Sequence, residues 1–483
     1  DPTCILGLLG SIVPYSDHNQ SPRNMYFTSQ KKAGLSRPCF DTEARVDKDQ
    51  YIMWYLQKPM VQTRAREFMV EQIGGITGGQ TPIWAVCCLD GFNMEDSIYM
   101  KRQAIQRGMF QMFQIHTVYN EAKSRNNEEE TFEIPPEDAV GKKGRADYSK
   151  LGPDGVVPIG TVVKSGDVLI GKVARLTDHF NSEGKQEDIV QDRSVVLKKV
   201  KHGVVHDVIY SSRERGNIIY VKVRTIREPE RGDKFASNAA QKGTIGLIVD
   251  EWNLPFSAKT GITPDIVMNT HAIPSRMTIG MMLECVNGKA TALDGKKRYA
   301  DTFAARNPEE VKRVLLDRGF NCMGREKMIC GKTGRTMECQ VFMGPVSYMR
   351  QSHMVHKKVH SRARGPRDIL TRQPTEGRSR DGGIRCGEME RDALISHSAP
   401  FSLRDRLCEN SDATPVPFCL DCGRIAEHPH SSRFGRGRHT QKPFCRACRK
   451  TNCVTMQVPF ASNLLFRELE AMHITARVEV EIE

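Results

Sequence analysis

Residues 84–97, WAVCCLDGFNMEDS, carry the clearest evidence for the fold class. Trp84 to Leu89 is an apolar run bounded by turn formers, which is typical of a buried β-strand. Helix-like spacing of apolar residues follows from Asp96 to Phe113. Residues 1–40 are interrupted by Pro, Gly, Asp and Asn so often that we expect no helix there. A strand that leads into a helix predicts mixed α/β structure around this stretch.

The sequence that follows changes character twice. Residues 115–232 alternate apolar runs with Gly, Asp and Asn turns, which predicts a β-rich module. Residues 233–376 return to mixed α/β sequence, with predicted helices at Met277–Asn287 and Pro308–Arg318. No internal repeat of a fixed period is present. The predicted strands of the β-rich module are Val156–Ile159, Thr161–Val163, Asp167–Val173, Val195–Val200, Val204–Tyr210 and Ile218–Arg227.

The last part of the sequence combines a loop with a small cysteine-bearing module. Ser361 to Gly387 is rich in Arg and Gly and lacks apolar periodicity, so we expect a long functional loop. The module begins at Cys408 and includes an amphipathic helix at Ala461–Met472. The chain is therefore predicted to be a mixed α/β multidomain protein. Its predicted divisions are residues 1–114, 115–231, 232–383, 384–407 and 408–483.

Length and composition describe a globular protein. The 483 residues suggest about three domains, at about 150 residues each. Hydrophobic residues make up 39% and charged residues 27%, which excludes a disordered or fibrous chain. The longest apolar stretch, Cys4 to Val13, is half of the roughly 20 residues that a membrane-spanning helix needs. We expect no membrane association and no secretion signal. Because the sequence starts at Asp1 without Met, we expect a fragment of a longer chain.

Four of the fifteen cysteines form two C-x-x-C pairs, Cys419-Cys422 and Cys445-Cys448, which are separated by 22 residues. Four thiolates at this spacing predict one structural Zn²⁺ in a closed tetrahedral site. A redox C-x-x-C is the alternative, which two pairs in one short module disfavour. An odd number of cysteines in a long basic chain indicates a reducing, intracellular compartment. Further candidate ligands in the same module are His428, His430, His439 and Cys453.

The net charge of +13 is concentrated in one region. Residues 350–450 hold 21 Lys and Arg against 11 Asp and Glu. Such a surplus favours a polyanionic partner, because each phosphate that a protein neutralises releases condensed counterions. A solvated basic face is the alternative explanation of the charge alone.

Two weaker patterns place carboxylates and lysines at turns. Glu95-Asp96 follows a strand, where adjacent carboxylates can bind Mg²⁺, although such a pair more often marks the start of a helix. Lys234 and Lys242 lie in Gly-bearing turns, where they can hold phosphates as point charges or be solvated lysines.

Arg23 and Arg276 stand beside prolines, a setting that suits bidentate phosphate contact as well as buried salt bridges. No Ser-His-Asp order, Walker A lysine loop or G-x-G-x-x-G fingerprint stands out in the sequence. Nucleophilic catalysis and the ordinary mononucleotide folds therefore have no support in the sequence.

Several stretches of the sequence match one family in their residues and in their order, and together they cover the chain nearly from end to end. The matching stretches are Ser11–Asn24, Gly91–Ser97, Gly232–Ser237, Gln241–Gly246, Pro264-Asp265, Asn269–Met277, His353–Gly365, Leu370–Pro374, Glu376–Gly383, Gly387–Asp392 and the cysteine pairs. The chain resembles the C-terminal portion of the second-largest (β-like) subunit of multisubunit DNA-directed RNA polymerases.

The sequence departs from the family pattern at three places. Phe92-Asn93-Met94 stands where Tyr-Asn-Gln is common, and Asn238-Ala239-Ala240 stands where Arg-His-Gly is common. Arg298–Phe303 matches only in part the Gly-Asp-Ala-Ser/Thr-Pro-Phe stretch that is common in the family. The pattern is closer to archaeal, eukaryotic and large-DNA-virus enzymes than to bacterial ones. We expect a divergent, virus-encoded subunit that serves viral transcription.

The resemblance implies nucleotidyl transfer as the reaction. The RNA 3′-OH attacks the α-phosphate of a template-selected NTP, and pyrophosphate leaves. Glu95 and Asp96 match the family's acidic pair, which helps to position the second Mg²⁺ that arrives with the NTP. The permanent Mg²⁺ belongs to aspartates of the largest subunit.

The resemblance also implies roles for the basic residues. Arg23 and Arg276 match arginines that face the triphosphate, and Lys234 and Lys242 match lysines near the phosphates and the RNA 3′ end. The residues that match the path of the RNA–DNA hybrid are His353, Lys358, Arg362, Arg364, Arg372, Arg378 and Arg380.

For the fold, the resemblance implies a hybrid-binding-like α/β core in residues 1–114 and 232–383. Residues 115–231 would be an inserted wall-like module, 384–407 an anchor-like segment and 408–483 a zinc-binding clamp-like module. The implied partners are the largest subunit, without which the enzyme is inactive, smaller assembly subunits, template DNA, the RNA–DNA hybrid and NTPs.

The implied location is the nucleus for a cellular eukaryotic enzyme, and the cytoplasm or virion for a viral one. Two other functions remain open at this point. The chain is alternatively a non-catalytic structural paralogue of the polymerase subunit, or a zinc-ribbon protein that binds nucleic acid.

Overall fold

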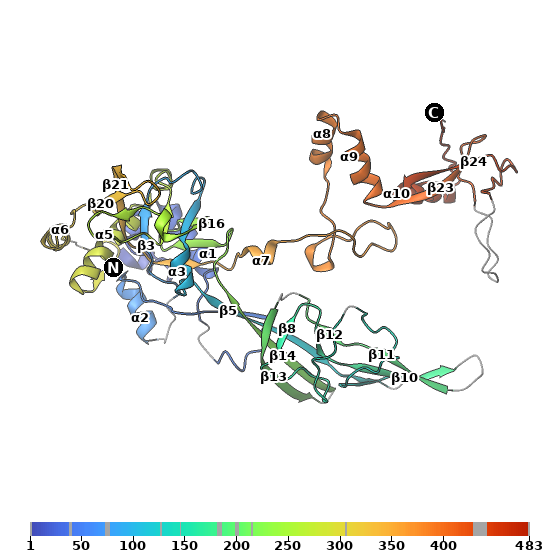
Figure 1. Cartoon of the computed structure of the whole chain (residues 1–483), viewed down its shortest axis with the longest axis horizontal. Coiled ribbons are helices and arrows are strands. Elements are labelled where there is room, and N and C mark those ends of the chain that lie inside the picture. The colour runs from blue at the N-terminus through green and yellow to red at the C-terminus, as the bar shows by residue number, and fades with distance from the viewer. Residues whose placement is uncertain are drawn as a thin grey trace. The chain divides into compact units, whose positions relative to one another are not determined.

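The structure is a computed structural model that describes residues 2–37, 41–72, 78–125, 128–144, 146–180, 186–198, 202–213, 216–304, 307–427 and 442–481. The chain folds into two compact units, Asp1–Lys357 and Lys358–Glu483 (Figure 1). Each unit is described by itself. Among the described residues, no helix combines the length and apolar character that crossing a membrane requires.

A nine-stranded mixed sheet forms the centre of the first unit. Its strand pairs are antiparallel except β3–β18 and β4–β16, which are parallel. Trp84, Met100 and Phe235 are fully buried in its core. The strands, in spatial order, are β17 (Phe256–Ser257), β20 (Arg325–Ile329), β21 (Thr336–Pro345), β3 (Ile83–Val86), β18 (Ile266–Met268), β4 (Ser97–Lys101), β16 (Lys242–Val249), β15 (Lys234–Ser237) and β22 (Tyr348–Arg350).

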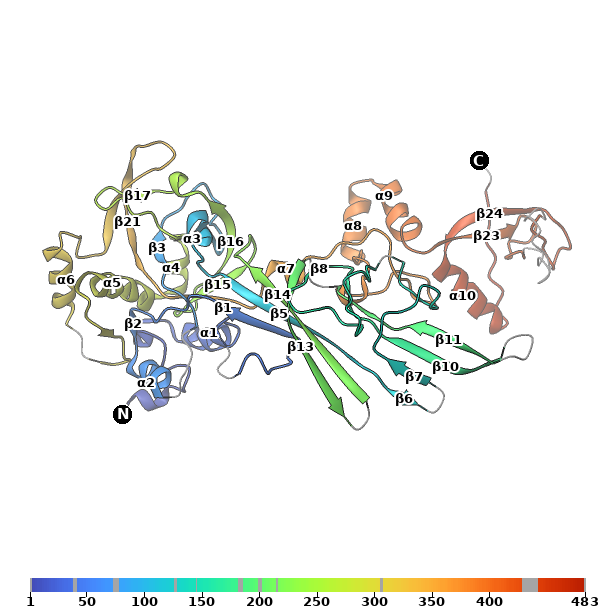
Figure 2. The same ribbon diagram turned by 60° about the horizontal axis from the view of Figure 1, so that its bottom comes forward.

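Helices cover this sheet and the segments around it. The predictions of helices at 277–287 and 308–318 are confirmed by α5 (Ile279–Asp294) and α6 (Pro308–Asp317), which lie together near β21 (Figure 2). Asn307 caps α6 by accepting a hydrogen bond from Glu309 N at 3.2 Å. The other helices of this region are α1 (Ser21–Lys32), α2 (Arg64–Gln72), α3 (Arg102–Gln106), α4 (Ala272–Arg276) and α7 (Val355–Lys358), with 3₁₀ turns η1 (Pro2–Ile5), η2 (Ser16–His18) and η3 (Glu251–Asn253).

Two predictions about helices are wrong. Residues 1–40 do contain a helix, α1, which accommodates Pro22 in its first turn and carries lysines in its last. Only Phe27 and Gln30 of α1 are buried, so the apolar spacing that announces a helix is missing. The helix predicted from Asp96 to Phe113 is strand β4, the short α3 and the start of β5 (Met112–Glu121). Residues 98–101 are buried between β18 and β16, and this tertiary packing overrides the helical spacing.

The prediction of β-rich structure in residues 115–232 is confirmed. Long strands β13 (His202–Arg213) and β14 (Gly216–Arg227) form an antiparallel ribbon (Figure 1). The ribbon is part of a five-stranded sheet in the order β1-β5-β14-β13-β8, whose outer strands are β1 (Asp49–Met53) and β8 (Val162–Lys164). Val163, Val221 and Val223 are buried in its core. Of the individual strand predictions, Val156–Ile159 is wrong, because only Val156 makes an isolated bridge, to Ile170. Asp167–Val173 is divided between β9 (Val168–Ile170) and the start of β10 (Val173–Phe180). Val195–Val200 is too long, since β12 ends at Val196, and its residues 199 and 200 lie outside the described residues.

The strands of the β-rich region and the remaining small sheet are β1 (Asp49–Met53), β5 (Met112–Glu121), β6 (Ser124–Arg125), β7 (Glu128–Thr131), β8 (Val162–Lys164), β9 (Val168–Ile170), β10 (Val173–Phe180), β11 (Gln186–Asp192), β12 (Val195–Val196), β13 (His202–Arg213) and β14 (Gly216–Arg227), with β2 (Val61–Gln62) beside β19 (Arg298–Tyr299).

The second unit begins with a long loop and ends in a small cysteine-bearing module. The loop predicted at 361–387 is confirmed, since its one helical element is the 3₁₀ turn η4 (Arg378–Arg380). The helix predicted at 461–472 is confirmed as α10 (Phe460–Ala471). The other elements are α8 (Glu388–Ser396), α9 (Pro400–Arg404), the π-helical turn η5 (Asp405–Glu409) and the antiparallel pair β23 (Ala413–Cys419) and β24 (Cys453–Pro459).

Candidate functional site

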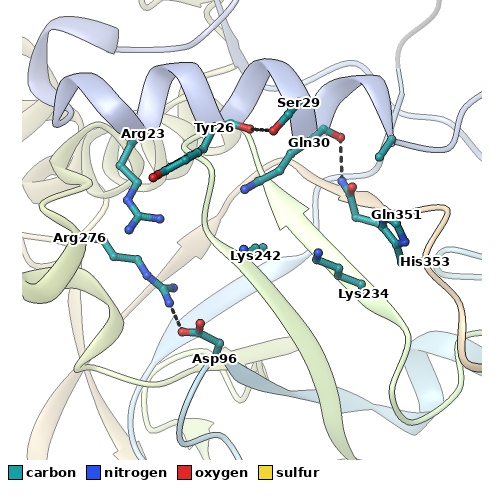
Figure 3. A pocket seen from close by; sticks show the side chains of 11 residues that line it. Arg23, Tyr26, Ser29, Gln30, Asp96, Lys234, Lys242, Arg276, Gln351 and His353 are labelled. Atoms are coloured by element: carbon teal, nitrogen blue, oxygen red, sulfur yellow. Dashed lines mark hydrogen bonds and ion pairs between the residues drawn. The ribbon is translucent and has the colours of Figure 1, made fainter.

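A pocket of about 560 Å³ in the first unit brings together most of the predicted site residues of that unit (Figure 3). Its walls come from α1, from the end of α4, and from the strand ends around β15, β16 and β22. Four cations and one carboxylate line it, which makes the pocket strongly basic. The lining residues are Arg23, Tyr26, Ser29, Gln30, Ala33, Asp96, Lys234, Lys242, Arg276, Gln351 and His353.

Helix α1 supplies one wall of the pocket. Arg23, Tyr26, Gln30 and Ala33 all line it, and their spacing of three and four residues places them on one helix face. The Arg23 guanidinium lies over the Tyr26 ring, 5.2 Å from its centroid. Burial and the nearby Arg276 lower the pKa of Arg23, which indicates that two cations share this wall. Arg23 Nε is buried without a hydrogen-bond partner among the described residues.

The segment before α1 is fixed to the start of α5. Asn19 Oδ1 accepts a hydrogen bond from Gly280 N at 2.9 Å. A Cβ on Gly280 would lie 2.7 Å from that same oxygen and 2.8 Å from Tyr15 O, so a side chain there would push the segment away. This close approach sets where α1, and with it Arg23, begins.

The acidic pair lies in the turn between β3 and β4. Glu95 and Asp96 both have positive φ, at 48° and 71°, so the turn directs adjacent carboxylates differently from a helix start. Asp96 lines the pocket and forms an ion pair with Arg276 (Figure 3). Glu95 is exposed, does not line the pocket, and makes no side-chain hydrogen bond or ion pair with another described residue.

Strand β16 passes very close to this turn. Thr244 N donates a hydrogen bond to Asp96 O at 3.0 Å. A Cβ on Gly243 would lie 2.9 Å from the same oxygen, so glycine is required beside Asp96. Lys242, which precedes it, is exposed in the pocket and has no side-chain partner among the described residues.

Arg276 is held at the end of α4 by two side chains. Its Nη1 donates to Gln241 Oε1 at 2.8 Å, and its Nη2 pairs with Asp96. Gln241 is itself fixed, because its Nε2 donates to Ala272 O at 3.0 Å and to Thr278 Oγ1 at 2.6 Å. The guanidinium therefore has a fixed orientation before any ligand binds.

Lys234 stands on the opposite side, at the start of β15. Its backbone is fixed by Gln351 N, which donates to Lys234 O at 2.8 Å. The residue before it, Asp233, is buried and paired with the buried Arg350. Gln351 also reaches α1, where its Nε2 donates to Gln30 O at 3.0 Å (Figure 3).

The arrangement can bind a polyanion. Four cations from separate segments face one cavity, and its single lining carboxylate, Asp96, is paired with Arg276, so positive charge exceeds negative charge there. Guanidinium and ammonium groups that are already oriented bind phosphate oxygens with charge-assisted hydrogen bonds. The pocket is therefore suited to an oligophosphate.

The residues expected along a nucleic-acid path divide between the two units. His353 is exposed and lines the pocket of the first unit. Lys358 and the five arginines lie in the second unit. Arg364 and Arg380 are exposed without a side-chain partner among the described residues, whereas Arg362 and Arg372 contact other parts of their own unit.

The four predicted cysteine ligands form one cluster. The Sγ atoms of Cys419, Cys422, Cys445 and Cys448 all lie within 4.8 Å of one another, and those of Cys422 and Cys445 are 3.6 Å apart. A tetrahedral Zn²⁺ with Zn–S bonds of 2.3 Å requires about 3.8 Å between sulfurs, so the cluster fits one such ion. The backbone N–H of Arg424 lowers the pKa of Cys422 to about 7, whereas the neighbouring Cys422 sulfur raises the pKa of Cys448. Four thiolates together therefore need a cation to offset their charge, which a bound metal would supply.

Among the described residues, no alternative ligand joins this cluster. Cys453 on β24 lies opposite Cys419 on β23 in the backbone register of the strand pair, and it lies outside the four-sulfur group. His428, His430 and His439 lie outside the described residues.

Sequence reasoning missed three residues that shape the pocket. Tyr26 carries a signal only once α1 is known, because it lies one turn from Arg23. Asp233 and Arg350 are far apart in the sequence, and their pairing has no local signal.

Comparison with known proteins identifies relatives of the whole chain. Residues 9–380 match the family described as RNA polymerase Rpb2, domain 6, and residues 382–481 match RNA polymerase Rpb2, domain 7. The chain is 41% identical over 483 residues to DNA-directed RNA polymerase II subunit RPB2 of Encephalitozoon cuniculi, covering 99% of this chain and 41% of that protein.

Plant and archaeal proteins show the same similarity. Identity is 39% over 481 residues to DNA-directed RNA polymerase II subunit 2 of Arabidopsis thaliana, covering 99% of this chain and 40% of that protein. It is 38% over 486 residues to DNA-directed RNA polymerase subunit Rpo2 of Saccharolobus shibatae, covering 99% and 42%. The chain thus spans about two fifths of the length of these relatives.

Proposed function

Since the chain belongs to the Rpb2 family of second-largest RNA polymerase subunits, of which it matches domains 6 and 7, we propose that it supplies part of the active centre of a DNA-directed RNA polymerase. The reaction is template-directed nucleotidyl transfer. The RNA 3′-OH attacks the α-phosphate of an NTP, the bond to the β-phosphate breaks, and pyrophosphate leaves. The observation that carries this proposal is the pocket in which four cations from separate segments converge.

The four cations would bind the triphosphate of the incoming NTP. Arg23 and Arg276 lie on one side and offset the charge that develops on the leaving pyrophosphate. Lys234 and Lys242 lie on the strands opposite and approach the phosphates and the RNA 3′ end as point charges. Because Arg276 is already oriented by Gln241 and Asp96, little reorganisation accompanies binding.

The acidic pair fits a role beside an NTP-bound Mg²⁺. The Glu95 carboxylate has no partner among the described residues, and one oxygen of Asp96 remains beyond its pair with Arg276. Two carboxylates do not form a complete cage, which suits an ion that takes its remaining ligands from phosphate oxygens and water. When bound, Mg²⁺ would offset charge on the phosphates, while Glu95 and Asp96 would orient it from the protein side.

The rest of the chain would guide nucleic acid and partner subunits. We assign residues 1–114 and 232–383 to a hybrid-binding core, 115–231 to a wall-like insertion, 384–407 to an anchor-like segment and 408–483 to a clamp-like zinc module. His353, Lys358 and Arg362–Arg380 would face the RNA–DNA hybrid, where basic side chains contact backbone without regard to sequence. The cysteine cluster would hold one structural Zn²⁺.

Activity would require partners. The largest subunit would supply the permanent Mg²⁺, and smaller subunits would assist assembly. A nuclear location follows for a eukaryotic enzyme, and the viral origin and reducing compartment stay predictions.

Lys242→Ala provides a direct test in the reconstituted enzyme. Because Lys242 has no side-chain partner among the described residues, its removal should leave the fold intact. Loss of one charge-assisted phosphate contact should lower kcat/KM for nucleotide addition by roughly 10- to 100-fold. Lys327→Ala is the matched control, because Lys327 is exposed on β20 outside the pocket. Wild-type kcat/KM in Lys242→Ala would remove the pocket from the mechanism, and an assembled but inactive wild-type enzyme would favour a structural paralogue.

A further inference from the structure

The basic loop of the second unit, residues 360–383, is tied together at its two ends. His360 Nε2 forms a hydrogen bond of 2.6 Å with Gly382 O, and Arg362 Nη1 donates to Asp381 O at 2.6 Å. Gly382 is buried, and a Cβ there would lie 2.5 Å from Thr375 O. The first residues of the loop are therefore packed against the last.

The guanidinium of Arg362 donates hydrogen bonds to backbone oxygens of the loop. Besides Asp381 O, it donates through Nη2 to Pro366 O at 3.0 Å. A Cβ on Gly365 would lie 3.2 Å from Arg362 Cζ, so the guanidinium lies close against the backbone at Gly365. Its two Nη groups reach two separate parts of the loop, and this bridging uses the planar fork that distinguishes arginine from lysine.

Arg372 joins the same loop to the cysteine-bearing module. Its guanidinium lies 4.0 Å from the centroid of the Phe460 ring. Phe460 begins α10 and directly follows β24, whose partner β23 ends at Cys419. The middle of the loop is therefore held by a module that is itself organised by the cysteine cluster.

Arg364 and Arg380 differ from these two. Both are exposed, and neither side chain has a hydrogen bond, ion pair or ring contact with another described residue. They lie within the framework that Arg362 and Arg372 stabilise.

We infer that four of the six arginines of the loop divide into two kinds, with Arg362 and Arg372 as positioning residues and Arg364 and Arg380 as residues that contact nucleic-acid phosphate. This inference rests on the proposed function, because it takes the hybrid backbone as the ligand. A loop that is already shaped before binding loses less conformational entropy when the hybrid binds. The positioning residues would thus raise affinity without neutralising a phosphate.

Salt dependence separates the two kinds in the reconstituted polymerase. The measurement is the affinity for a labelled RNA–DNA hybrid scaffold at several salt concentrations. Arg364→Ala and Arg380→Ala should each reduce the slope of log K against log salt by about one, because one fewer counterion is released. Arg364→Lys should keep both the slope and nearly all of the affinity, because the charge remains.

The positioning residues should behave in the opposite way. Arg362→Lys keeps the charge but loses the fork, so affinity should fall by roughly tenfold while the slope stays the same. Phe460→Leu, which changes no charge, should likewise lower affinity without changing the slope. Subunit assembly and zinc content of each variant, measured alongside, establish that the module is folded.

Each outcome has a distinct meaning. If Arg362→Lys and Phe460→Leu keep wild-type affinity, and Arg362→Ala reduces the slope as Arg364→Ala does, then Arg362 contacts phosphate and the inference is wrong. If none of the alanine variants changes the slope, the loop does not contact the hybrid, and the proposed role of this segment fails instead.

Discussion

Arg350 and Asp233 form an ion pair that is closed to solvent. Arg350 Nη2 lies 2.6 Å from Asp233 Oδ2, and each side chain is 1% exposed. Arg350 also donates to the carbonyls of Phe110 and Glu228, at 2.8 and 3.0 Å, and Asp233 Oδ1 accepts from Val355 N at 3.0 Å. One buried pair thus fixes the turn before Lys234, the end of β22 and the start of α7.

Breaking this pair on one side should destabilise the first unit. Asp233→Asn leaves a buried guanidinium without its counter-charge, and the expected loss is about 3–5 kcal/mol in the free energy of unfolding. The combined Asp233→Leu and Arg350→Met variant removes both charges and should be more stable than Asp233→Asn. Urea unfolding of the three proteins provides the measurement. Equal midpoints for wild type and Asp233→Asn would show that the pair contributes little.

Replacing the acidic pair should slow catalysis while leaving the fold intact. In the assembled enzyme, Glu95→Ala with Asp96→Ala should slow single-nucleotide addition by roughly 10²- to 10³-fold, the effect of losing one oriented electrostatic stabiliser. Raised Mg²⁺ should restore part of the rate, because the ion would be bound more loosely.

Glu338→Ala is the matched acidic control, since Glu338 is exposed on β21 outside the pocket. A purely structural role in this turn, through the Asp96–Arg276 ion pair, instead predicts a loss of about 1 kcal/mol of stability or less with an unchanged rate. Rates on a preformed RNA–DNA scaffold at several Mg²⁺ concentrations distinguish the two. Wild-type extension by the double variant would exclude the pair from the reaction.

The cysteine cluster should hold about one zinc per chain. Replacing Cys422 and Cys445 together with serine removes two of four thiolates and should abolish stoichiometric zinc, because a structural site requires all four ligands. Elemental analysis of the purified protein measures this. Cys453→Ser should retain zinc, because Cys453 lies outside the four-sulfur group. Zinc retained by the double variant would point to other ligands.

Glu284 should make stability depend on pH. Its side chain is buried in α5, and burial raises its pKa to about 7, from 4.5. The folded protein therefore binds more protons than the unfolded chain between pH 4.5 and 7. Its contribution is complete below pH 4.5 and is lost as pH rises to 7, by roughly 3 kcal/mol.

Glu284→Gln should remove this dependence, since Gln stays neutral and still accepts the hydrogen bond from Ser347 N. Urea midpoints at pH 5 and pH 7.5 should differ less in the variant than in wild type. Glu338→Gln, at an exposed position, should leave the pH dependence unchanged. An identical pH profile in wild type and Glu284→Gln would show that Glu284 ionises normally.

The sequence predicted features whose cause is local. The β-rich region follows from alternating apolar runs and turns, and α6 follows from Asn307, Pro308 and the spacing after them. The four cysteines come together because two C-x-x-C pairs at a fixed spacing are enough to define the cluster.

The features that were missed have distant causes. Helix α1 has little apolar periodicity because its pocket face carries Arg23, Tyr26 and Gln30. The helical spacing around strand β4 is misleading, because the burial of this strand depends on β16 and β18, which come more than a hundred residues later. Similarly, no local pattern links Asp233 with Arg350.

The bond from Gln351 Nε2 to Gln30 O bears on the order of events during synthesis. Leu35 N likewise donates to Arg350 O at 2.8 Å, so α1 docks on residues that leave the ribosome more than three hundred positions after it. Until those residues have been synthesised, the surface on which α1 packs is absent from the nascent chain. Contacts of such long range make folding slow. The docking of α1 also brings the positive charges of the pocket together at the end of folding. A polyphosphate that binds only the completed pocket would therefore stabilise the native state by mass action.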